Sequence, residues 1–367
     1  MQQFILVGID HGTTNSCVAM MLSDGVRLLC ADTGNPSALT LPSYIHMSKQ
    51  AGILIGSLAR NATLAKSSGT GYGGYKTRIG SDDRFEFKEM DRVLTAPEMG
   101  QLVLGALLEP CRKILGYPAL AAVVTVPAKF NAAQYDGTRK AAELAGLEQV
   151  VLLQEPIAAS LAYAFGMQKD AKWIVFDLGG GTLDVSLVSL KDGHMEVPER
   201  GNAGDGDLGG RLFDMRLMDY VIGPKKDDKQ RWQYYRGLCP DYRPLRAKYD
   251  LEDLTEGKNP GSWGRLMLAV EEAKIRLSEE ERTVLKLDAP LCKDAKGKTV
   301  EVEMPLTRAI YEKLIESEVA RAVNCCLTLL RNNHLKPADI DFMILVGGPS
   351  KTPFVQEIGR ASCRERV

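Results

Sequence analysis

One pattern occurs twice in this chain: an apolar run, an Asp, a Gly/Thr turn, a second apolar run, an Asp-Gly turn and a third apolar run. The two copies are FILVGIDHGTTNSCVAMMLSDGVRLL at residues 4–29 and WIVFDLGGGTLDVSLVSLKDGHMEV at residues 173–197. Short apolar runs predict buried strands and Asp-Gly pairs are typical of tight hairpins, so each copy predicts a three-stranded β-meander. The duplication predicts two similar lobes that face one phosphate chain.

The turn between the first two strands of each copy has the residue types that a phosphate needs. Glycines let the backbone approach a ligand and adopt positive φ, so that successive N–H groups and Thr hydroxyls can point at phosphate oxygens. Asp10 and Asp177 end the strands beside these turns. Their carboxylates would repel phosphate unless a hard cation lay between them, and Mg²⁺ that keeps several of its waters fits that role. A single copy is more often just a turn, whereas the matched pair favours phosphate binding.

Length and composition narrow the classes of protein. At 367 residues the chain exceeds one ordinary core, which predicts two domains or lobes. Its 46 Lys and Arg against 47 Asp and Glu give a net charge of −1, so neither nucleic acid nor an anionic membrane is expected as the main partner. The start, MQQFILVGID, has no basic n-region, which predicts neither a signal peptide nor a membrane span and makes the cytoplasm the expected compartment. Eight cysteines without CxxC spacing predict neither a zinc site nor a redox pair.

Outside the duplicated pattern, predicted helices and strands alternate with two polar insertions. The stretches 36–100 and 223–264 are rich in Gly, Pro or charge and predict an inserted subdomain in each lobe. Glu155 lies at the junction between a predicted strand and the helix that follows it, a position where catalytic carboxylates are common. The aromatic and basic run RWQYYR at 231–236 is expected to be a solvated part of the second insertion rather than a nucleic-acid site. Helices are predicted at 101–115, 131–145, 155–166, 265–281 and 306–330, and further strands at 121–126, 150–153 and 342–346.

With these residues placed, the chain resembles the ATPase domain of the 70-kDa heat-shock chaperones (Hsp70), in the actin/hexokinase superfamily. The resemblance runs from about Val7 to Gln356 and rests on segments that stand in the family's order: VGIDHGTTNSCVA, VVTVPAKFN, QEPIAASLAYA, FDLGGGTLDVSL, AGDGDLGG, VEEAKIRLS and ILVGGPSKTP. It implies an α/β protein with the two-lobed actin-like ATPase fold, in which duplicated ribonuclease H-like cores each carry an inserted subdomain. It also implies hydrolysis of ATP to ADP and phosphate, with the nucleotide state switching the lobes to control a peptide-binding domain absent from this chain.

The resemblance also sets the expected domain boundaries. Lobe I would span 1–168, with its core at 1–36 and 101–168 and its inserted subdomain at 37–100. Lobe II would span 169–356, with its core at 169–223 and 305–356 and its inserted subdomain at 224–304. The tail at 357–367, EIGRASCRERV, resembles translated sequencing-adapter sequence and is expected to be foreign, so that the ATPase domain is truncated near its C-terminus.

When the family's functional residues are carried over one by one, the resemblance implies a role for each matching residue. Asp10 and Asp177 would hold Mg²⁺ through water. Lys76 would approach the γ-phosphate, while Glu155 and Asp184 would lie near the attacking water and the ions. The expected chemistry is in-line attack by water, dominated by positioning and charge neutralisation. The nucleotide-binding residues would be Gly12, Thr13, Thr14, Gly179, Gly180, Gly181, Thr182, Gly209, Gly210, Glu271, Lys274, Ser278, Gly347, Gly348 and Lys351.

Several residues depart from the family pattern. Ile275 stands where many eukaryotic members have an arginine that stacks on adenine, a change compatible with ATP because bacterial members can carry an aliphatic residue there. Tyr135, Ala132 and Val151 replace the usual Arg, Asp and Arg on the surface that relays nucleotide state, although Arg139 retains a cation. These changes indicate a divergent member, and they bear on interdomain coupling more than on ATP binding.

The resemblance implies ATP or ADP and Mg²⁺ as cofactors, with K⁺ as a further candidate ion. The partners it implies are a J-domain co-chaperone and a nucleotide exchange factor. Unfolded peptides would be clients only where a C-terminal domain follows this one. Neither nucleic acid nor a membrane is expected to bind.

Other interpretations stay open. Lys76 could be a solvated lysine in a flexible loop, Glu155 an ordinary first-turn helix acid and Asp184 a strand-edge residue. The whole chain could be an actin-like filament protein in which nucleotide hydrolysis controls the timing of assembly. It could also be a small-molecule kinase of the same superfamily. Nucleotide-dependent sedimentation would indicate the first, and ATP depletion only with an added acceptor would indicate the second. The segments QEP and VEEAKIRLS favour the chaperone branch.

Overall fold

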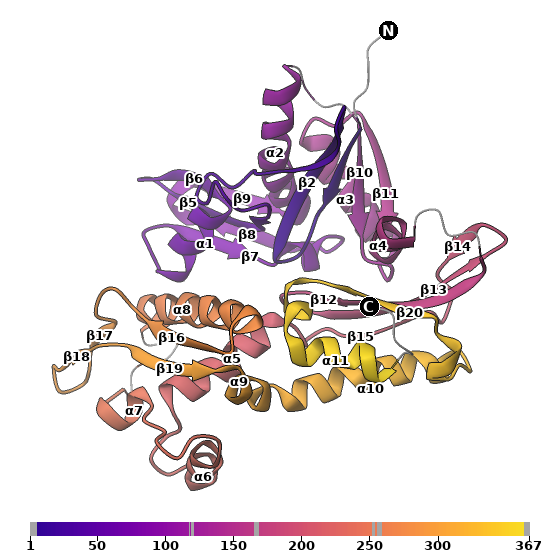
Figure 1. The fold of residues 1–367 in the computed structure, drawn as a ribbon. Helices are drawn as coiled ribbons and strands as arrows, with labels where there is room; N and C mark the ends of the chain where they lie inside the picture. Colours follow the sequence, from indigo (N-terminus) through magenta and orange to yellow (C-terminus); the bar gives the residue numbers. More distant parts are fainter. Residues whose placement is uncertain are drawn as a thin grey trace. The chain divides into compact units, whose positions relative to one another are not determined.

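The computed structural model describes residues 6–116, 118, 121–164, 169–251, 254 and 259–362. The chain divides into two compact units (Figure 1). Unit 1 comprises the described residues up to Lys169 together with Lys191–Val197, and unit 2 comprises Asp170–Leu190 with the described residues from Pro198 onward. Each unit has its own cluster of buried apolar side chains, as expected of a chain that exceeds one core.

The first copy of the duplicated pattern forms one side of the main sheet of unit 1, with its first strand in the middle. Its three described strands form the predicted antiparallel meander, and the predicted beginning of the first strand at 4–5 lies outside the described residues. Two further strands pair in parallel with β1, giving the order β11-β10-β1-β2-β3, while β4 pairs with β2 off this path. Because β1, β10 and β11 run in the same direction, their carboxyl ends lie along one edge of the sheet. The strands are β1 (Leu6–Asp10), β2 (Asn15–Leu22), β3 (Gly25–Leu29), β4 (Leu41–Pro42), β10 (Ala121–Val126) and β11 (Gln149–Gln154).

Three helices accompany this sheet, and local signals explain where they begin. Thr95 and Glu98 form a capping box, so α2 begins earlier than the predicted residue 101. Asn131 and Gln134 form a second capping box at the start of α3, which completes the predicted crossover from β10 to β11. Glu155 is the first residue of α4, and the predicted end of that helix at 165–166 lies outside the described residues. The helices are α2 (Ala96–Leu115), α3 (Ala132–Leu144) and α4 (Glu155–Ala164).

The stretch predicted to be the first insertion, residues 37–100, contains several short elements. A three-stranded sheet has the order β6-β5-β7, and β8 pairs with β9 in a hairpin. Gly74 has φ 69°, a left-handed conformation that suits glycine, at the start of the 3₁₀ helix that contains Lys76. The elements are β5 (Tyr44–Ser48), β6 (Gly52–Ile55), α1 (Ser57–Leu64), β7 (Thr70–Gly73), η1 (Tyr75–Arg78), β8 (Arg84–Phe87), η2 (Lys88–Met90) and β9 (Arg92–Thr95).

The second copy forms the main sheet of the other half of the chain, in the order β14-β13-β12-β20 with β15 beside β13. The meander is again as predicted, and β20 occupies the predicted residues and pairs in parallel with β12. Apolar side chains are buried along β12, β13 and β20, which is why the apolar runs in the sequence predicted these strands. The strands are β12 (Ala171–Leu178), β13 (Leu183–Lys191), β14 (His194–Glu196), β15 (Asn202–Asp205) and β20 (Phe342–Val346).

The prediction of one helix over 306–330 is wrong. The residues before Arg308 form β19, which pairs with β16 and alternates exposed with buried side chains. Thr307 then caps a short helix by accepting a hydrogen bond from the Ile310 N–H, because a threonine at this position satisfies a free donor of the first turn. Ile315 separates this helix from the next one. The elements are β16 (Arg282–Lys286), β17 (Cys292–Lys293), β18 (Thr299–Val300), β19 (Glu303–Thr307), α9 (Arg308–Leu314), α10 (Glu316–Asn332) and η3 (Pro337–Asp339).

The remaining helices of unit 2 lie before, within and after the second predicted insertion, residues 224–304. The run RWQYYR lies in α6, and the expectation that it is solvated is wrong for Tyr235, whose ring is buried 5.2 Å from that of Tyr220 and 5.4 Å from that of Tyr242. No helix among the described residues is long and apolar enough to cross a membrane. The helices are α5 (Gly210–Ile222), α6 (Lys229–Leu238), α7 (Leu245–Lys248), α8 (Pro260–Glu279), η4 (Gly348–Lys351) and α11 (Pro353–Ser362).

Candidate functional site

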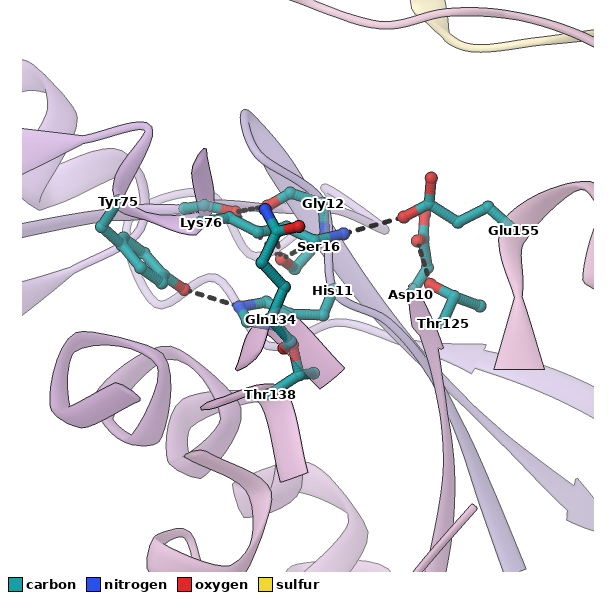
Figure 2. Close-up of polar contacts among 11 residues, drawn as sticks. Asp10, His11, Gly12, Ser16, Tyr75, Lys76, Thr125, Gln134, Thr138 and Glu155 are labelled. Atoms are coloured by element: carbon teal, nitrogen blue, oxygen red, sulfur yellow. Dashed lines mark hydrogen bonds and ion pairs between the residues drawn. The ribbon is translucent and has the colours of Figure 1, made fainter. Parts of the chain in front are cut away.

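In unit 1, polar groups gather where the parallel strands β1, β10 and β11 end (Figure 2). Asp10 ends β1 and is exposed, and Glu155 directly follows β11. The Thr125 hydroxyl of β10 donates a hydrogen bond of 2.7 Å to Asp10 Oδ1. The parallel pairing brings these residues to one sheet edge although they are far apart in sequence, and Thr125 was not among the predicted residues. Asp10 is thereby oriented while its carboxylate stays open to solvent.

The first Gly/Thr turn is held by two serines that the sequence did not single out. The Gly12 N–H donates to Ser16 Oγ at 3.1 Å, and the Ser43 hydroxyl donates to the Gly12 carbonyl at 2.8 Å. A Cβ at residue 12 would lie 2.0 Å from the Asn15 carbonyl oxygen, so only glycine fits there. Gly12 therefore shapes the turn through close backbone approach, and its own N–H is used inside the turn. The neighbouring Thr13 and Thr14 are half-buried in the same turn.

Lys76 is a buried cation paired with Glu155. Its side chain is 2% exposed, and Nζ donates a hydrogen bond of 2.8 Å to Glu155 Oε1, which belongs to a side chain that is 21% exposed. Nζ also lies 5.7 Å from the centroid of the Phe130 ring. A buried ammonium is costly unless a carboxylate compensates it, so the two side chains depend on each other. The alternative of a solvated lysine in a flexible loop is wrong for this residue.

Two further buried residues adjoin this pair and were missed by sequence reasoning. His11 Nε2 and the Tyr75 hydroxyl share a hydrogen bond of 2.9 Å, and both side chains are fully buried. Burial, reinforced by the nearby Lys76 cation, lowers the pKa of His11 from 6.5 to about 3, so the imidazole is neutral at physiological pH. The signal that could have found the pair is the adjacency of His11 to Asp10 and of Tyr75 to Lys76.

In unit 2, the second Gly/Thr turn is tied to the start of α5. The Gly179 N–H donates to the Thr182 carbonyl at 2.9 Å, which closes the turn between β12 and β13. The Gly210 N–H donates to the Gly179 carbonyl at 3.0 Å, and the Arg211 N–H donates to the Gly180 carbonyl at 2.8 Å. The predicted loops at 179–182 and 209–210 therefore form one backbone assembly. A Cβ at Gly209 would lie 2.6 Å from Gly181, so glycine permits this approach.

The predicted nucleoside residues of α8 approach the same assembly through Lys274. Lys274 Nζ lies 2.7 Å from Asp214 Oδ1 and 3.3 Å from the Gly210 carbonyl, and the lysine is 8% exposed. Glu271 lies one turn earlier on α8, and Ser278 one turn later donates to the Lys274 carbonyl at 3.5 Å. Asp214 was not predicted from the sequence. Because α5 and α8 are packed together, the lysine is fixed beside the Gly-rich turns rather than free in solution.

The turn after β20 meets the end of β12. Asp177 lies opposite Asp184 in the antiparallel pair and next to Val346 in the parallel pair. A Cβ at Gly347 would lie 3.2 Å from Asp177 Oδ1, and one at Gly210 would lie 2.8 Å from Pro349 Cγ. The structure thus brings four segments together within unit 2, namely 177–184, 209–210, Lys274 of α8 and 347–349. Gly348 begins η4, in which Lys351 is exposed.

Replacing Gly347 with alanine is expected to lower the free energy of unfolding of unit 2 by about 2–4 kcal/mol. Gly347 has φ 91°, and a Cβ there would lie 2.0 Å from the Leu178 carbonyl oxygen, a backbone atom that cannot easily move. Gly348→Ala is the matched control, because a Cβ at Gly348 meets nothing within 4 Å. Urea unfolding of both variants measures the difference. Equal loss in the two variants would contradict the argument.

The carboxylates beside the two turns fit Mg²⁺ as a ligand class. Among the described residues, no three or more His, Cys, Asp or Glu side chains gather into a metal cluster. Mg²⁺ commonly keeps several waters and takes only one or two carboxylates together with substrate phosphates. Asp177 with Asp184 opposite it suits such a water-rich site in unit 2, and the exposed Asp10 suits one in unit 1.

The duplicated meanders, the Gly-rich turns and the helices joining the strands define an α/β protein with the actin-like ATPase fold. The chain belongs to the Hsp70 family: a family model described as "Hsp70 protein" matches residues 6–231 and 244–364. Members of this family are chaperone ATPases that bind ATP or ADP with Mg²⁺. The match resumes after a gap at 232–243, which covers most of α6 and the loop behind it. It also extends beyond Gln356 into the predicted foreign tail, whose residues 363–367 lie outside the described part of the chain.

Proposed function

We propose that this chain binds ATP with Mg²⁺ and hydrolyses it to ADP and phosphate, as the nucleotide-dependent switch of an Hsp70-type chaperone. The single observation that carries the proposal is the buried Lys76–Glu155 pair beside Asp10 and the Gly12 turn. Lys76 is paired with Glu155 and lies at the sheet edge next to the Gly12 turn. Its ammonium can therefore stabilise the negative charge that develops on a phosphoryl group during transfer. The family membership supports the reaction class.

Each group has a defined role in the proposed reaction. Lys76 stabilises charge on the transferred phosphoryl group, and Glu155 orients the lysine and the attacking water. Asp10 and Asp177 would hold Mg²⁺ through water, with Asp184 near the attacking water and the ions, and bound Mg²⁺ would neutralise charge on the phosphates. The two Gly/Thr turns contact the phosphates, and the side chains of Glu271, Lys274 and Ser278 bind the nucleoside, with the 347–351 turn beside them. K⁺ is a further candidate ion.

The proposal extends to organisation and partners. Inserted subdomains at 37–100 and 224–304 would flank the cores of the two lobes. A J-domain co-chaperone and a nucleotide exchange factor would regulate turnover, and unfolded peptides would be the clients of an attached domain. Tyr135, Ala132 and Val151 would modify the relay to that domain.

Phosphate release from ATP by the purified chain tests the proposal. We expect slow release with Mg²⁺ and none with excess EDTA, without any added acceptor. A small-molecule kinase would require an acceptor, and a filament protein would sediment when ATP is added. Absence of both ATP binding and phosphate release would refute the proposed function.

A further inference from the structure

We infer that His11 and Tyr75 are positioning residues for Lys76. The hydrogen bond between them fixes the 3₁₀ helix η1 against the first Gly/Thr turn and so sets where the Lys76 amine lies. This inference rests on the proposed ATPase function of the same site and identifies what holds its lysine in place.

His11 and Tyr75 each adjoin residues assigned to the phosphate site. His11 stands between Asp10 and Gly12, and Tyr75 immediately precedes Lys76. The 2.9 Å hydrogen bond between their side chains therefore joins two backbone segments that are 64 residues apart (Figure 2). Each segment carries groups assigned to the phosphate site. A shift of η1 relative to β1 would move Lys76 relative to the turn, and the bond opposes that shift.

The rings of His11 and Tyr75 are tightly packed. Both side chains have no exposed surface, and their ring centroids lie 5.8 Å apart. A Cβ at Gly100 of α2 would lie 3.6 Å from His11 Cε1, 3.8 Å from Tyr75 Cε2 and 2.9 Å from Ala141 Cβ. Gly100 therefore lies against both rings, and the absence of its side chain lets α2 approach Ala141 of α3 closely. Packing this close leaves little room for other rotamers, so the hydrogen bond has a fixed direction.

The chemistry of the His11 and Tyr75 side chains also favours a positioning role. The His11–Tyr75 hydrogen bond is directional, and it lies beside Lys76, whose ammonium donates to Glu155. His11 Nδ1 is buried without a hydrogen-bond partner among the described residues. Burying such a polar atom opposes folding, whereas two apolar side chains of similar shape would avoid that cost. The pair is therefore better explained by the direction it gives to η1 than by a gain in stability.

The test separates position from stability with three variants. Tyr75→Phe removes one hydroxyl, and the double variant His11→Leu/Tyr75→Phe removes both polar partners and leaves neither unpaired. Tyr72→Phe is the matched control, because its hydroxyl donates to the Glu86 carbonyl in the same insertion and does not contact His11. For each variant we would measure the melting temperature, the ATP dissociation constant, the single-turnover rate of hydrolysis and the rate of Lys76 acylation by an acetyl ester, followed by mass spectrometry.

We expect the double variant to melt within a few degrees of the parent and to bind ATP within about threefold of the parent affinity. Its hydrolysis should be about tenfold slower, because a displaced catalytic group loses rate rather than binding. Its Lys76 should acylate about tenfold faster, because the amine leaves its 2%-exposed position more often. Tyr72→Phe should match the parent in every measurement. Tyr75→Phe should resemble the double variant in rate and have the lower melting temperature.

A folded double variant with either parent-like acylation of Lys76 or parent-like hydrolysis would overturn the inference. If the double variant does not fold, the same two readouts on Tyr75→Phe decide in the same way. A parent chain that releases no phosphate from ATP would instead count against the proposed function. In that case the acylation rate alone would still decide whether the pair holds Lys76.

Discussion

Replacing Lys76 with alanine is expected to slow single-turnover ATP hydrolysis by about 10²- to 10³-fold, while the ATP dissociation constant changes by less than about threefold. Removal of one preorganised charge donor from a transition state costs about 3–4 kcal/mol, which corresponds to this range of rates. The binding energy of ATP should come mainly from the turns and the nucleoside contacts, which the substitution leaves intact. Rapid mixing of a slight excess of protein with labelled ATP measures the rate, and equilibrium titration measures the affinity.

Two control variants distinguish a loss of catalysis from a loss of folding. Lys76→Ala removes the partner of a partly buried carboxylate, so Lys76→Met, which fills the same space without charge, is the second variant. Lys88→Ala removes an exposed lysine from the same insertion and should leave the rate unchanged. A parent-like rate in either folded Lys76 variant would refute the catalytic assignment of this residue.

The fold was most predictable where local pattern and tertiary packing agree. Both meanders, the strand at 342–346 and the crossover from β10 to β11 follow from apolar runs, Asp-Gly pairs and helix caps, all of which act over a few residues. The helix predicted at 306–330 differs from the structure at its first two residues, which belong to β19, and at Ile315, which separates α9 from α10. Leu306 and Thr307 pair with β16, more than 20 residues earlier in the chain, and no local signal shows that pairing.

The candidate site was predictable by residue type but not by contact. The sequence indicated Lys76 and Glu155 through the family pattern, yet nothing local shows that side chains 79 residues apart meet at 2.8 Å. The partners that orient the site were missed altogether. Nothing in the local sequence distinguishes these partners from other polar residues, and only strand register and helix packing give them their roles. They are Ser16, Ser43, Thr125 and Asp214.

Replacing Asp177 with asparagine is expected to weaken ATP binding in excess Mg²⁺ by about 10- to 100-fold. The carboxylate is assigned to ion binding through water, and loss of groups that orient a metal typically costs this factor in affinity. Asparagine keeps the size of the side chain, which matters because Gly347 packs closely against this position. Without Mg²⁺ the variant should bind ATP as well as the parent or slightly better, because one negative charge is gone from beside the phosphates.

The difference between the two conditions is therefore the diagnostic quantity. Equilibrium titration with a fluorescent ATP analogue, in Mg²⁺ and in EDTA, measures it for the parent, for Asp177→Asn and for the exposed control Asp288→Asn. The control has the same charge change in the same unit but should keep the parent's dependence on Mg²⁺. If the parent itself binds ATP equally well in Mg²⁺ and in EDTA, the assignment of Asp177 to the ion fails. If only the variant loses the dependence, the carboxylate at the end of β12 is what links the metal to the nucleotide.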